Sequence, residues 1–216
     1  RTVELTEAYP FVYGAAGVHP DEVGALNEES FQWLKDQCRR EKIVAVGEIG
    51  LDYYWDKEDH SIQKEWFVRQ LHMAEELKLP VIIHSREAAA DTLEILKRER
   101  DPGCPAVMHC YSYSPEMAKE YLKMGFYLGI GGVLTFKNGK KLKETVAEAP
   151  MERLLLETDC PYLAPVPYRG KRNDSGKLML VAEELGRIKG ISSQEVIRIT
   201  EENARRFFRL RQEEER

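Results

Sequence analysis

Five residues whose side chains can bind metal ions come at or just after the ends of short apolar runs. They are His19, Glu48, His84, His109 and Asp159, which follow the runs 15–18, 43–47, 80–83, 106–108 and 154–158. Imidazoles and carboxylates gathered at one place hold divalent ions such as Zn²⁺, Mn²⁺ or Mg²⁺. Such ions lower the pKa of bound water and clamp a transferring phosphoryl group, while a nearby carboxylate orients or deprotonates the water. The sequence therefore predicts a metal site suited to hydrolysis.

Each of these residues, taken alone, also fits a purely structural role. A single His after a strand is more often a hydrogen-bonding residue than a ligand. Glu48 could be half of a buried ion pair, and Asp159, before Cys160-Pro161, could begin an Asx turn. Four strand ends that each carry a ligand-type residue favour the metal site. Since successive strand residues point to opposite sides, we expect Cys110 and Cys160 to pack rather than to ligate.

The apolar runs alternate with longer amphipathic stretches. The runs predict strands buried on both faces, at Phe11–Val18, Ile43–Val46, Val81–Ile83, Ala106–Met108, Phe126–Ile130 and Leu154–Leu156. The amphipathic stretches predict helices at Ser61–Leu79, Ala88–Arg100, Glu116–Met124 and from Ser192 or Ser193 to about Arg209. The proline-rich stretch within Tyr162–Lys177 predicts one long loop, and long ordered loops are usually functional.

This alternation predicts an α/β fold with right-handed βαβ units and a parallel sheet. An open doubly wound sheet and a (β/α)8 barrel both fit the pattern, but the chain lacks a G-x-G-x-x-G dinucleotide fingerprint. In a barrel, the carboxyl ends of all strands meet on one face, where active sites are built. We therefore expect residues 1–216 to form a single domain, a TIM-type barrel that carries the metal site on this face.

Composition excludes several classes of protein. The chain has 216 residues, of which 43% are hydrophobic and 32% charged, so neither disorder nor a collagen-like structure is expected. No run approaches the roughly 18 to 20 apolar residues that span a membrane. A net charge of −5 argues against a protein that coats duplex DNA by bulk electrostatics. Four cysteines without a CxxC pair favour an intracellular protein. Within the cell, the expected place is the cytoplasm or the nucleus, and the mitochondrion remains open.

Several motifs together carry a family resemblance. They are Gly17-Val18-His19-Pro20, Gly47-Glu48-Ile49-Gly50-Leu51-Asp52, Pro80-Val81-Ile82-Ile83-His84-Ser85-Arg86, His109-Cys110-Tyr111-Ser112 and Glu157-Thr158-Asp159-Cys160-Pro161-Tyr162-Leu163. In this order they resemble the TatD family of metal-dependent deoxyribonucleases. The resemblance implies a TIM-type barrel of the amidohydrolase-like superfamily and two divalent ions, such as Mg²⁺, Mn²⁺ or Zn²⁺. It also implies hydrolysis of phosphodiester bonds in DNA, as a 3′-to-5′ exonuclease on single-stranded ends.

The resemblance also assigns roles to individual residues. Glu48 is implied to bridge two metal ions, and Asp159 to ligate metal and position or deprotonate the water, so both count as catalytic. His84 and His109 are implied to be further metal ligands. The expected substrate-binding residues are His19, Arg86, Ser112 and Arg169. The basic clusters Lys137–Lys143 and Arg169–Arg172 are candidate contacts to the DNA backbone, or simply solvated faces.

The chain departs from the family pattern in three places. Family members begin with a strand that ends in His-x-His, and no His-x-His occurs here, so we expect the first βα unit to be missing. Tyr113 replaces a small residue after the His-Cys-Tyr-Ser motif, where its ring could narrow the cleft or stack on a base. The proline usual after the acidic residue that follows Asn173 is also absent, which favours a more flexible loop.

Two other functions remain open from the sequence. A related metallohydrolase could act on an ester or an amide, for example an aminoacyl ester on RNA, because fold does not fix substrate. Alternatively, the chain could be an inactive truncated isoform that serves as a binding scaffold. Under the nuclease interpretation, five aromatic residues near the strand ends could stack on bases, and otherwise they cover the barrel mouth. They are Tyr53, Tyr54, Trp55, Tyr111 and Tyr113.

Overall fold

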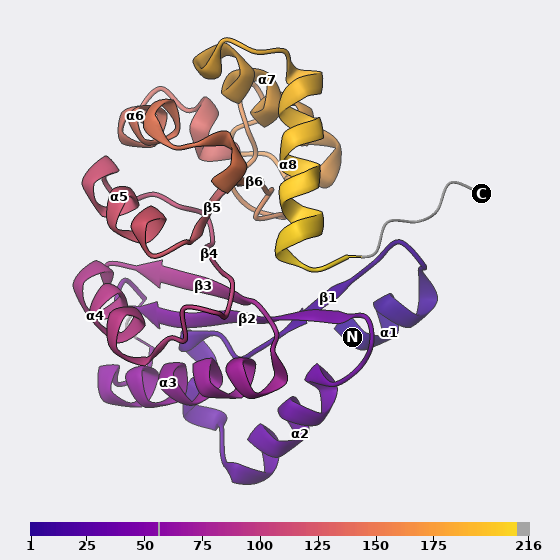
Figure 1. The fold of residues 1–216 in the computed structure, drawn as a ribbon, viewed down its shortest axis with the longest axis vertical. Helices are drawn as coiled ribbons and strands as arrows, with labels where there is room; N and C mark the ends of the chain where they lie inside the picture. Colours follow the sequence, from indigo (N-terminus) through magenta and orange to yellow (C-terminus); the bar gives the residue numbers. More distant parts are fainter. Residues whose placement is uncertain (56, 211–216) are drawn as a thin grey trace. The chain divides into compact units, whose positions relative to one another are not determined.

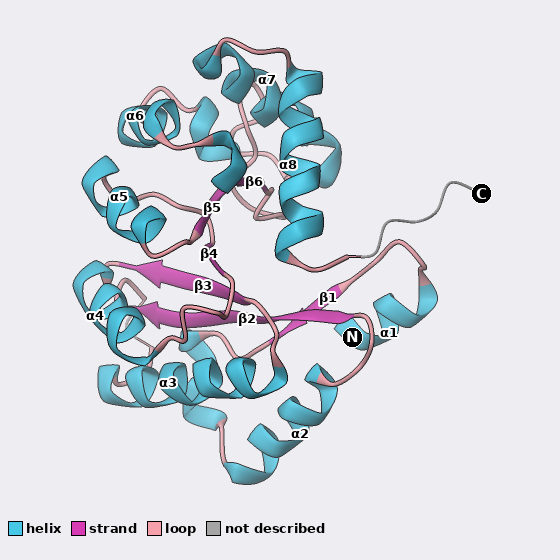
Figure 2. Ribbon diagram, viewed as in Figure 1, coloured by secondary structure: helices cyan, strands magenta, loops and turns pink. Residues whose placement is uncertain are grey.

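The protein has an α/β fold in which parallel strands alternate with helices along the chain (Figures 1 and 2). The computed structural model describes residues 1–55 and 57–210. These residues divide into two compact units, one of residues 1–107 and one that begins at Met108. Each unit has its own strands, helices and buried core, and the two are described in turn.

The first unit contains three parallel strands in chain order, β1 (Gly14–Ala16), β2 (Ile43–Asp52) and β3 (Val81–Arg86). In register, Ala16 pairs with Val46 on β2, and Gly50 on β2 pairs with His84 on β3. The helices of this unit are α1 (Thr2–Ala8), α2 (Glu28–Cys38), α3 (His60–Leu77) and α4 (Ala89–Glu99), with a 3-10 helix at Pro20–Ala25. Figure 2 shows α3 running beside β2, against which it packs.

Local sequence signals set the ends of these helices. Asn27 and Ser30 form a reciprocal capping box at the start of α2. The side chain of Asp59 accepts a hydrogen bond from the backbone N–H of Ser61 at the start of α3. Lys78 ends the same helix in the left-handed region, with φ of 57°. The buried face of α3 is mostly apolar, with Trp66, Phe67 and Leu71 among its residues, and it packs against β2, which fixes the helix to the sheet.

The second unit contains the parallel strands β5 (Tyr127–Ile130) and β6 (Leu154–Leu156), with Leu128 paired to Leu154. The strand β4 (Ala106–Met108) contains the boundary between the units. The helices of this unit are α5 (Pro115–Lys123), α6 (Lys140–Glu148), α7 (Leu178–Lys189) and α8 (Ser193–Phe207), with 3-10 helices at Gly132–Thr135, Met151–Arg153 and Ser175–Lys177. Serine side chains cap α5 and α8, as the sequence predicts.

A buried asparagine fastens the last helix of the second unit to β6. The amide of Asn203 on α8 donates hydrogen bonds to the backbone oxygens of Met151 and Leu154, at 2.7 and 2.9 Å. Asn203 is 1% exposed, so these bonds satisfy a polar group that would otherwise be costly to bury. Around it, Phe207 packs edge-on against Tyr127 within the core. The helix therefore covers β6 in one defined position.

Most predicted elements are confirmed, with corrections to three strands. The helices α3, α4, α5 and α8 and the strands β4, β5 and β6 lie within a few residues of their predicted bounds. The predicted strand Phe11–Val18 shrinks to β1, and Phe11 is 77% exposed. The strands β2 and β3 continue past the predicted ends at Val46 and Ile83. Their backbones keep pairing beyond the apolar residues because ladder hydrogen bonds do not require apolar side chains.

Parallel strands that follow chain order within each unit and are joined by helices are the repeating pattern of a TIM-type barrel. The predicted α/β class is therefore confirmed. The long loop predicted at Tyr162–Lys177 is present and ends in a 3-10 turn. Among the described residues, no helix is both long and apolar enough to cross a membrane.

Candidate functional site

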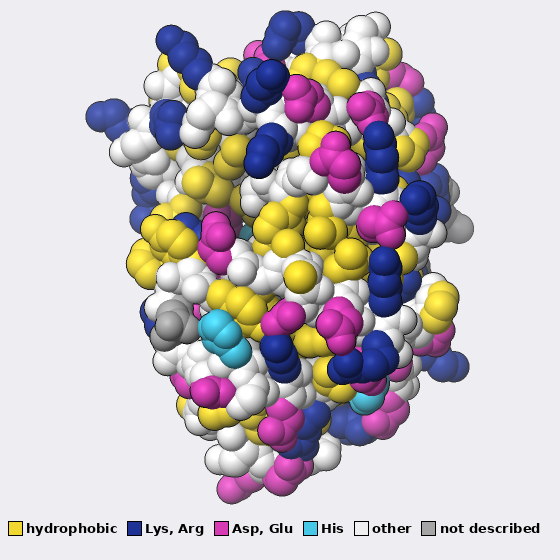
Figure 3. All heavy atoms as spheres, turned by 90° about the vertical axis from the view of Figure 1, so that its left-hand side faces the viewer, with side chains coloured by type: hydrophobic (Ala, Val, Ile, Leu, Met, Phe, Trp, Pro, Cys, Tyr) yellow, Lys and Arg dark blue, Asp and Glu magenta, His cyan; other side chains and the backbone are white. Residues whose placement is uncertain are grey.

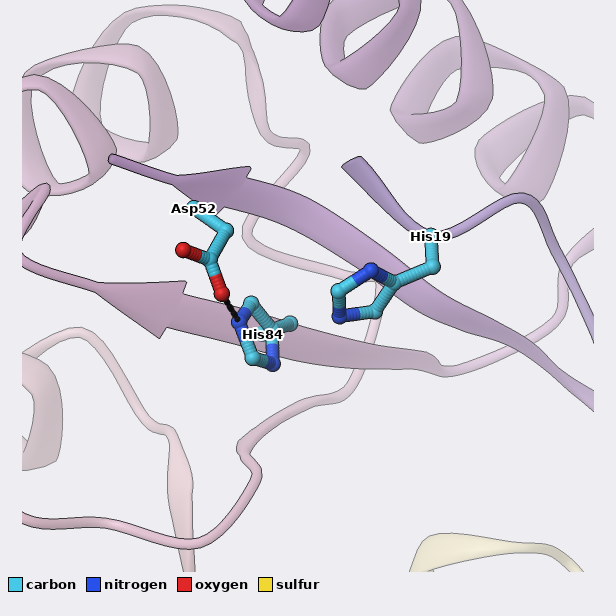
Figure 4. A group of neighbouring side chains, drawn as sticks. All are labelled: His19, Asp52 and His84. Atoms are coloured by element: carbon cyan, nitrogen blue, oxygen red, sulfur yellow. Dashed lines mark hydrogen bonds and ion pairs between the residues drawn. The ribbon is translucent and has the colours of Figure 1, made fainter. Parts of the chain in front are cut away.

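A buried carboxylate holds one of the predicted metal ligands. Asp52 at the end of β2 and His84 on the neighbouring strand β3 point toward each other, and the Nε2 of His84 lies 2.9 Å from Oδ2 of Asp52 (Figure 4). The other oxygen of Asp52 accepts backbone hydrogen bonds from Tyr54 and Trp55, at 2.9 and 3.0 Å. Burial raises the pKa of Asp52, but the hydrogen bonds from Trp55 and His84 outweigh it and leave the pKa below its usual value. Asp52 is therefore an ionised acceptor.

The ionised state of Asp52 determines which ring nitrogen of His84 carries the proton. An ionised carboxylate only accepts hydrogen bonds, so Nε2 of His84 carries the proton and Nδ1 carries the lone pair. That Nδ1 lies 3.7 Å from Oε2 of Glu48, which also projects from β2. Two ligand atoms that share one ion at about 2.1 Å are separated by about 3 to 4 Å. The Glu48–His84 pair therefore has the spacing and the donor atoms that a divalent ion requires.

His19 lies beside this pair, and its ring has the same tautomer as that of His84. Its ring is 4.3 Å from that of His84, centre to centre, and its Nδ1 accepts the backbone N–H of Asp21. Burial and the neighbouring His84 lower the pKa of His19, so the ring is neutral and its proton lies on Nε2. Ligand-type atoms of His19, Asp52 and His84 all lie within 4.8 Å of one another. A pocket of about 310 Å³, lined in part by His19 and Glu48, opens at this place in the first unit.

In the second unit a histidine again lies between two carboxylates, but its two ring nitrogens have exchanged roles. His109, directly after β4, has Nδ1 2.8 Å from Oε2 of Glu157 and Nε2 3.3 Å from Oδ1 of Asp159. Glu157 follows β6, and Asp159 adopts φ of 52°, a left-handed conformation that Asp tolerates better than most residues. Oε1 of Glu157 is buried and has no hydrogen-bond partner among the described residues. An orphaned acceptor beside an imidazole and a second carboxylate fits a site that receives a cation.

A glycine makes room for this second group. A Cβ at Gly129 on β5 would collide with Oε2 of Glu157 and would lie 3.2 Å from the backbone oxygen of Met108. Any side chain at this position would therefore displace the carboxylate from His109. The absence of a side chain at position 129 is what lets Glu157 reach the ring.

The structure brings the predicted ligands together in two pairs. Glu48 meets His84 in the first unit, and His109 meets Asp159 in the second. Unlike the prediction from the apolar runs, Glu48 and His84 lie within their strands and not beyond them. Side chains on a strand alternate between faces, so a residue within a strand reaches the site as well as one after it.

The remaining predicted residues have varied surroundings. The guanidinium of Arg86 lies over the ring of Tyr54, and that of Arg169 lies 4.4 Å from the ring of Phe136. Ser112 is exposed on the loop after His109. The prediction that Cys160 packs in the interior is wrong, because its thiol is exposed. The left-handed backbone at the preceding residue breaks the strand alternation on which that prediction depended.

Sequence reasoning missed the carboxylates of Asp52 and Glu157 as parts of the site. A signal for them was present, since Asp52 comes four residues after Glu48 and Glu157 two residues before Asp159. Even spacing in an extended chain places side chains on the same side. Of the basic clusters, Lys143 pairs with Glu184 at 2.9 Å, as a solvated face would. On the face shown in Figure 3, basic and acidic side chains are intermingled.

The sequence model of the family described as TatD related DNase matches residues 1–209. This chain belongs to the TatD family. The TatD resemblance of the motifs is thus confirmed over nearly the whole chain. One relative is the "Uncharacterized metal-dependent hydrolase YabD" of Bacillus subtilis (strain 168), which is 48% identical over 210 residues, or 97% of this chain and 82% of the relative.

Two further TatD proteins extend the comparison. The "3′-5′ ssDNA/RNA exonuclease TatD" of Edwardsiella piscicida is 36% identical over 218 residues, covering 97% of this chain and 83% of its own. The crystal structure of YJJV, a TatD homolog from Escherichia coli K12, superposes with a TM-score of 0.91. It is 30% identical and covers 98% of this chain and 82% of the homolog. The TatD family and these relatives support hydrolase activity that depends on a metal.

Proposed function

We propose that this TatD protein is a deoxyribonuclease that removes nucleotides from the 3′ end of single-stranded DNA. The observation that carries the proposal is the pair of histidines, each with one nitrogen held by a carboxylate and the other facing a second carboxylate. This arrangement orients each imidazole as a ligand, with the nitrogen opposite the supporting carboxylate turned toward the second carboxylate. The name of the Edwardsiella relative, an exonuclease of single-stranded DNA and RNA, supports the choice of substrate.

We further propose that residues 1–216 act as one catalytic domain with two divalent ions, such as Mg²⁺, Mn²⁺ or Zn²⁺. Glu48 and His84 of the first unit and His109 and Asp159 of the second unit are the ligands that this chain would supply. When bound, such ions activate water and neutralise charge on the phosphate. The mixed nitrogen and oxygen donors suit these ions.

The protein groups have distinct tasks in this proposal. Asp159 orients the attacking water and accepts its proton, because its carboxylate is partly exposed to solvent. His19 donates a hydrogen bond from its Nε2–H to an oxygen of the scissile phosphate, since its Nδ1 is occupied by the backbone of Asp21. Arg86 binds a phosphate of the DNA, and Ser112 and Arg169 also contact the DNA. No step requires His19 to change its charge.

The test is release of nucleotides from a 5′-labelled single-stranded oligonucleotide, with Mg²⁺, Mn²⁺ or Zn²⁺ and with a chelator. The proposal expects a ladder shortened from the 3′ end that disappears with the chelator. Glu48→Gln and Asp159→Asn should each reduce the rate at least a hundredfold, whereas Glu29→Gln, an exposed carboxylate on α2, should not change it. No release by the folded protein together with hydrolysis of a simple ester would overturn the nuclease and favour an esterase.

A further inference from the structure

Two large aromatic side chains are exposed directly after β2. Tyr54 is 54% exposed and Trp55 is 56% exposed, and their rings stand edge to face with centres 5.0 Å apart. Aromatic side chains normally gain free energy by burial, and adjacent exposed rings commonly mark a binding surface. Neither ring serves the core of the first unit. The pair therefore calls for a ligand with an apolar, planar face.

Cations flank the same two rings. The guanidinium of Arg86 lies 3.9 Å from the centre of the Tyr54 ring and 5.4 Å from that of Trp55. The ammonium of Lys57 lies 6.0 Å from the centre of the Trp55 ring. A guanidinium that stacks on a ring directs its N–H groups within its own plane, where they can bind an anion. Planar rings and positive charges are thus combined on one patch.

A short chain of hydrogen bonds joins this patch to the candidate metal ligands. The backbone N–H groups of Tyr54 and Trp55 both donate to one oxygen of Asp52, whose other oxygen holds His84. Arg86 is two residues beyond His84 on β3 and is the register partner of Asp52. The residues of the patch are therefore anchored on the carboxylate that holds His84 and on the strand that carries it.

The other aromatic candidates near the strand ends have structural roles. The ring of Tyr53 stacks on His60 with centres 3.6 Å apart, and its hydroxyl donates to Asp91. Tyr111 is 2% exposed, and its hydroxyl donates to the backbone of Ser114. Tyr113 is half-buried, and its ring stands edge to face with that of Tyr111, with centres 6.2 Å apart. Among the aromatic residues singled out from the sequence, Tyr54 and Trp55 are thus the exposed ones.

We propose that Tyr54, Trp55 and Arg86 form a subsite that binds single-stranded DNA by stacking on its bases and pairing with its phosphates. The inference rests on the proposed function, because it names how the substrate of that same site is held. Unpaired bases present both faces to such rings, whereas bases inside a duplex do not. The subsite therefore selects single strands without selecting a sequence.

The experiment measures binding of two fluorescein-labelled decamers by anisotropy, in chelator so that neither is cut. One is dT10, and the other has the same phosphates with abasic sites in place of every base. The wild-type chain should bind dT10 at least tenfold more tightly than the abasic strand. Trp55→Ala and Tyr54→Ala should each weaken dT10 binding about tenfold and abasic binding less, and Arg86→Ala should weaken both alike.

Matched variants separate stacking from general loss of structure. Trp33 on α2 is 63% exposed, and Arg39 forms a surface ion pair, so Trp33→Ala and Arg39→Ala should leave binding unchanged. Trp55→Phe should keep most of the affinity, because phenylalanine also stacks. Equal binding of the two decamers by the wild type, or Trp55→Phe binding as weakly as Trp55→Ala, would overturn the subsite.

The outcomes distinguish the subsite from the nuclease. Binding in chelator does not depend on hydrolysis, so a chain that prefers dT10 but releases no nucleotide overturns the nuclease and retains the subsite. A chain that releases nucleotides in a metal-dependent manner but binds both decamers alike overturns the subsite and retains the nuclease.

Discussion

The buried carboxylate of Asp52 accepts a hydrogen bond from Nε2 of His84 at 2.9 Å, which turns the lone pair of the ring toward Glu48. Glu157 does the same for His109 but holds Nδ1, so Nε2 faces Asp159. Carboxylates behind ligand histidines fix the tautomer and raise the basicity of the coordinating nitrogen. In both units a supporting carboxylate thus turns the other ring nitrogen toward a second carboxylate, and that nitrogen is Nδ1 in His84 and Nε2 in His109.

Asp52→Asn should weaken metal binding by about 10- to 100-fold. The Asn oxygen can still accept the backbone N–H groups of Tyr54 and Trp55, so the turn is kept. The Asn amide would then donate to Nε2 of His84 and move the proton to Nδ1, where it blocks the ligand position. Calorimetric titration of the metal-free chain with Mn²⁺ or Zn²⁺ measures the affinity.

The matched control for this titration is Asp36→Asn, which removes an exposed carboxylate on α2 that pairs with Arg39. It should bind metal as the wild type does. An affinity of Asp52→Asn equal to that of the control would show that Asp52 has no part in holding the ligand. Thermal unfolding of both variants without metal checks that the comparison is between folded chains.

Glu157→Gln should change the tautomer of His109 even without metal. The Gln amide would donate to Nδ1 and leave the proton on Nε2, which faces Asp159. The ¹⁵N shifts of the His109 ring, measured by long-range ¹H–¹⁵N correlation, report the tautomer directly. An unchanged ring spectrum would mean that Glu157 does not set the proton position. The His84 ring, whose partner is in the first unit, serves as the internal reference.

Gly129→Ala should destabilise the fold by about 2 kcal/mol. The new Cβ would collide with Oε2 of Glu157, so the carboxylate must leave His109 or the strand must shift. Urea unfolding measures the free energy of unfolding. Gly103→Ala is the control, because its nearest neighbour would be a side-chain oxygen at 3.4 Å, an ordinary contact. Equal stabilities of the two variants would contradict the tight fit of Glu157.

Glu184 on α7 should stabilise the protein in a pH-dependent manner. Its hydrogen bond with Arg187, and then that with Lys143, lower its pKa from 4.5 to about 2. A carboxyl with a lowered pKa in the folded state contributes stability above its unfolded pKa, and the contribution is lost as the pH falls from about 4.5 toward 2. Glu184→Gln should cost about 1 kcal/mol at neutral pH, since Arg187 is largely exposed.

The difference between Glu184→Gln and the wild type, measured by urea unfolding, should shrink as the buffer is taken below pH 4.5. Glu183→Gln, which changes the exposed neighbouring carboxylate, should show no such trend. A difference that is constant with pH would assign the effect to packing instead of charge.

The strands and the positions of the candidate ligands at or near their ends were predictable because their signals are local. Short apolar runs of Val, Ile and Leu mark buried strands, and the residues at their carboxyl ends include Glu48, His84, His109 and Asp159. The helix ends at Ser114 and Ser192 were predictable for the same reason, because a capping serine acts within its own turn.

The supporting carboxylates were not predictable, because their roles depend on contacts distant in sequence. Asp52 meets His84 across 32 positions, and Glu157 meets His109 across 48. Nothing in the residues beside Glu157 shows that Gly129 leaves space for it. The predicted ends of β2 and β3 were wrong for a related reason, since backbone pairing continues past the last apolar residues.

Asp52 contacts the candidate ligand His84 with one oxygen and the backbone N–H groups of Tyr54 and Trp55 with the other. In the proposed function, an ion held by His84 and a DNA strand held by Tyr54 and Trp55 would therefore both act on the position of Asp52. Binding equilibria linked in this way are reciprocal. The factor by which the bound ion raises the affinity for DNA equals the factor by which bound DNA raises the affinity for the ion. At a low metal concentration, the DNA-bound protein would therefore bind the ion more readily than the DNA-free protein.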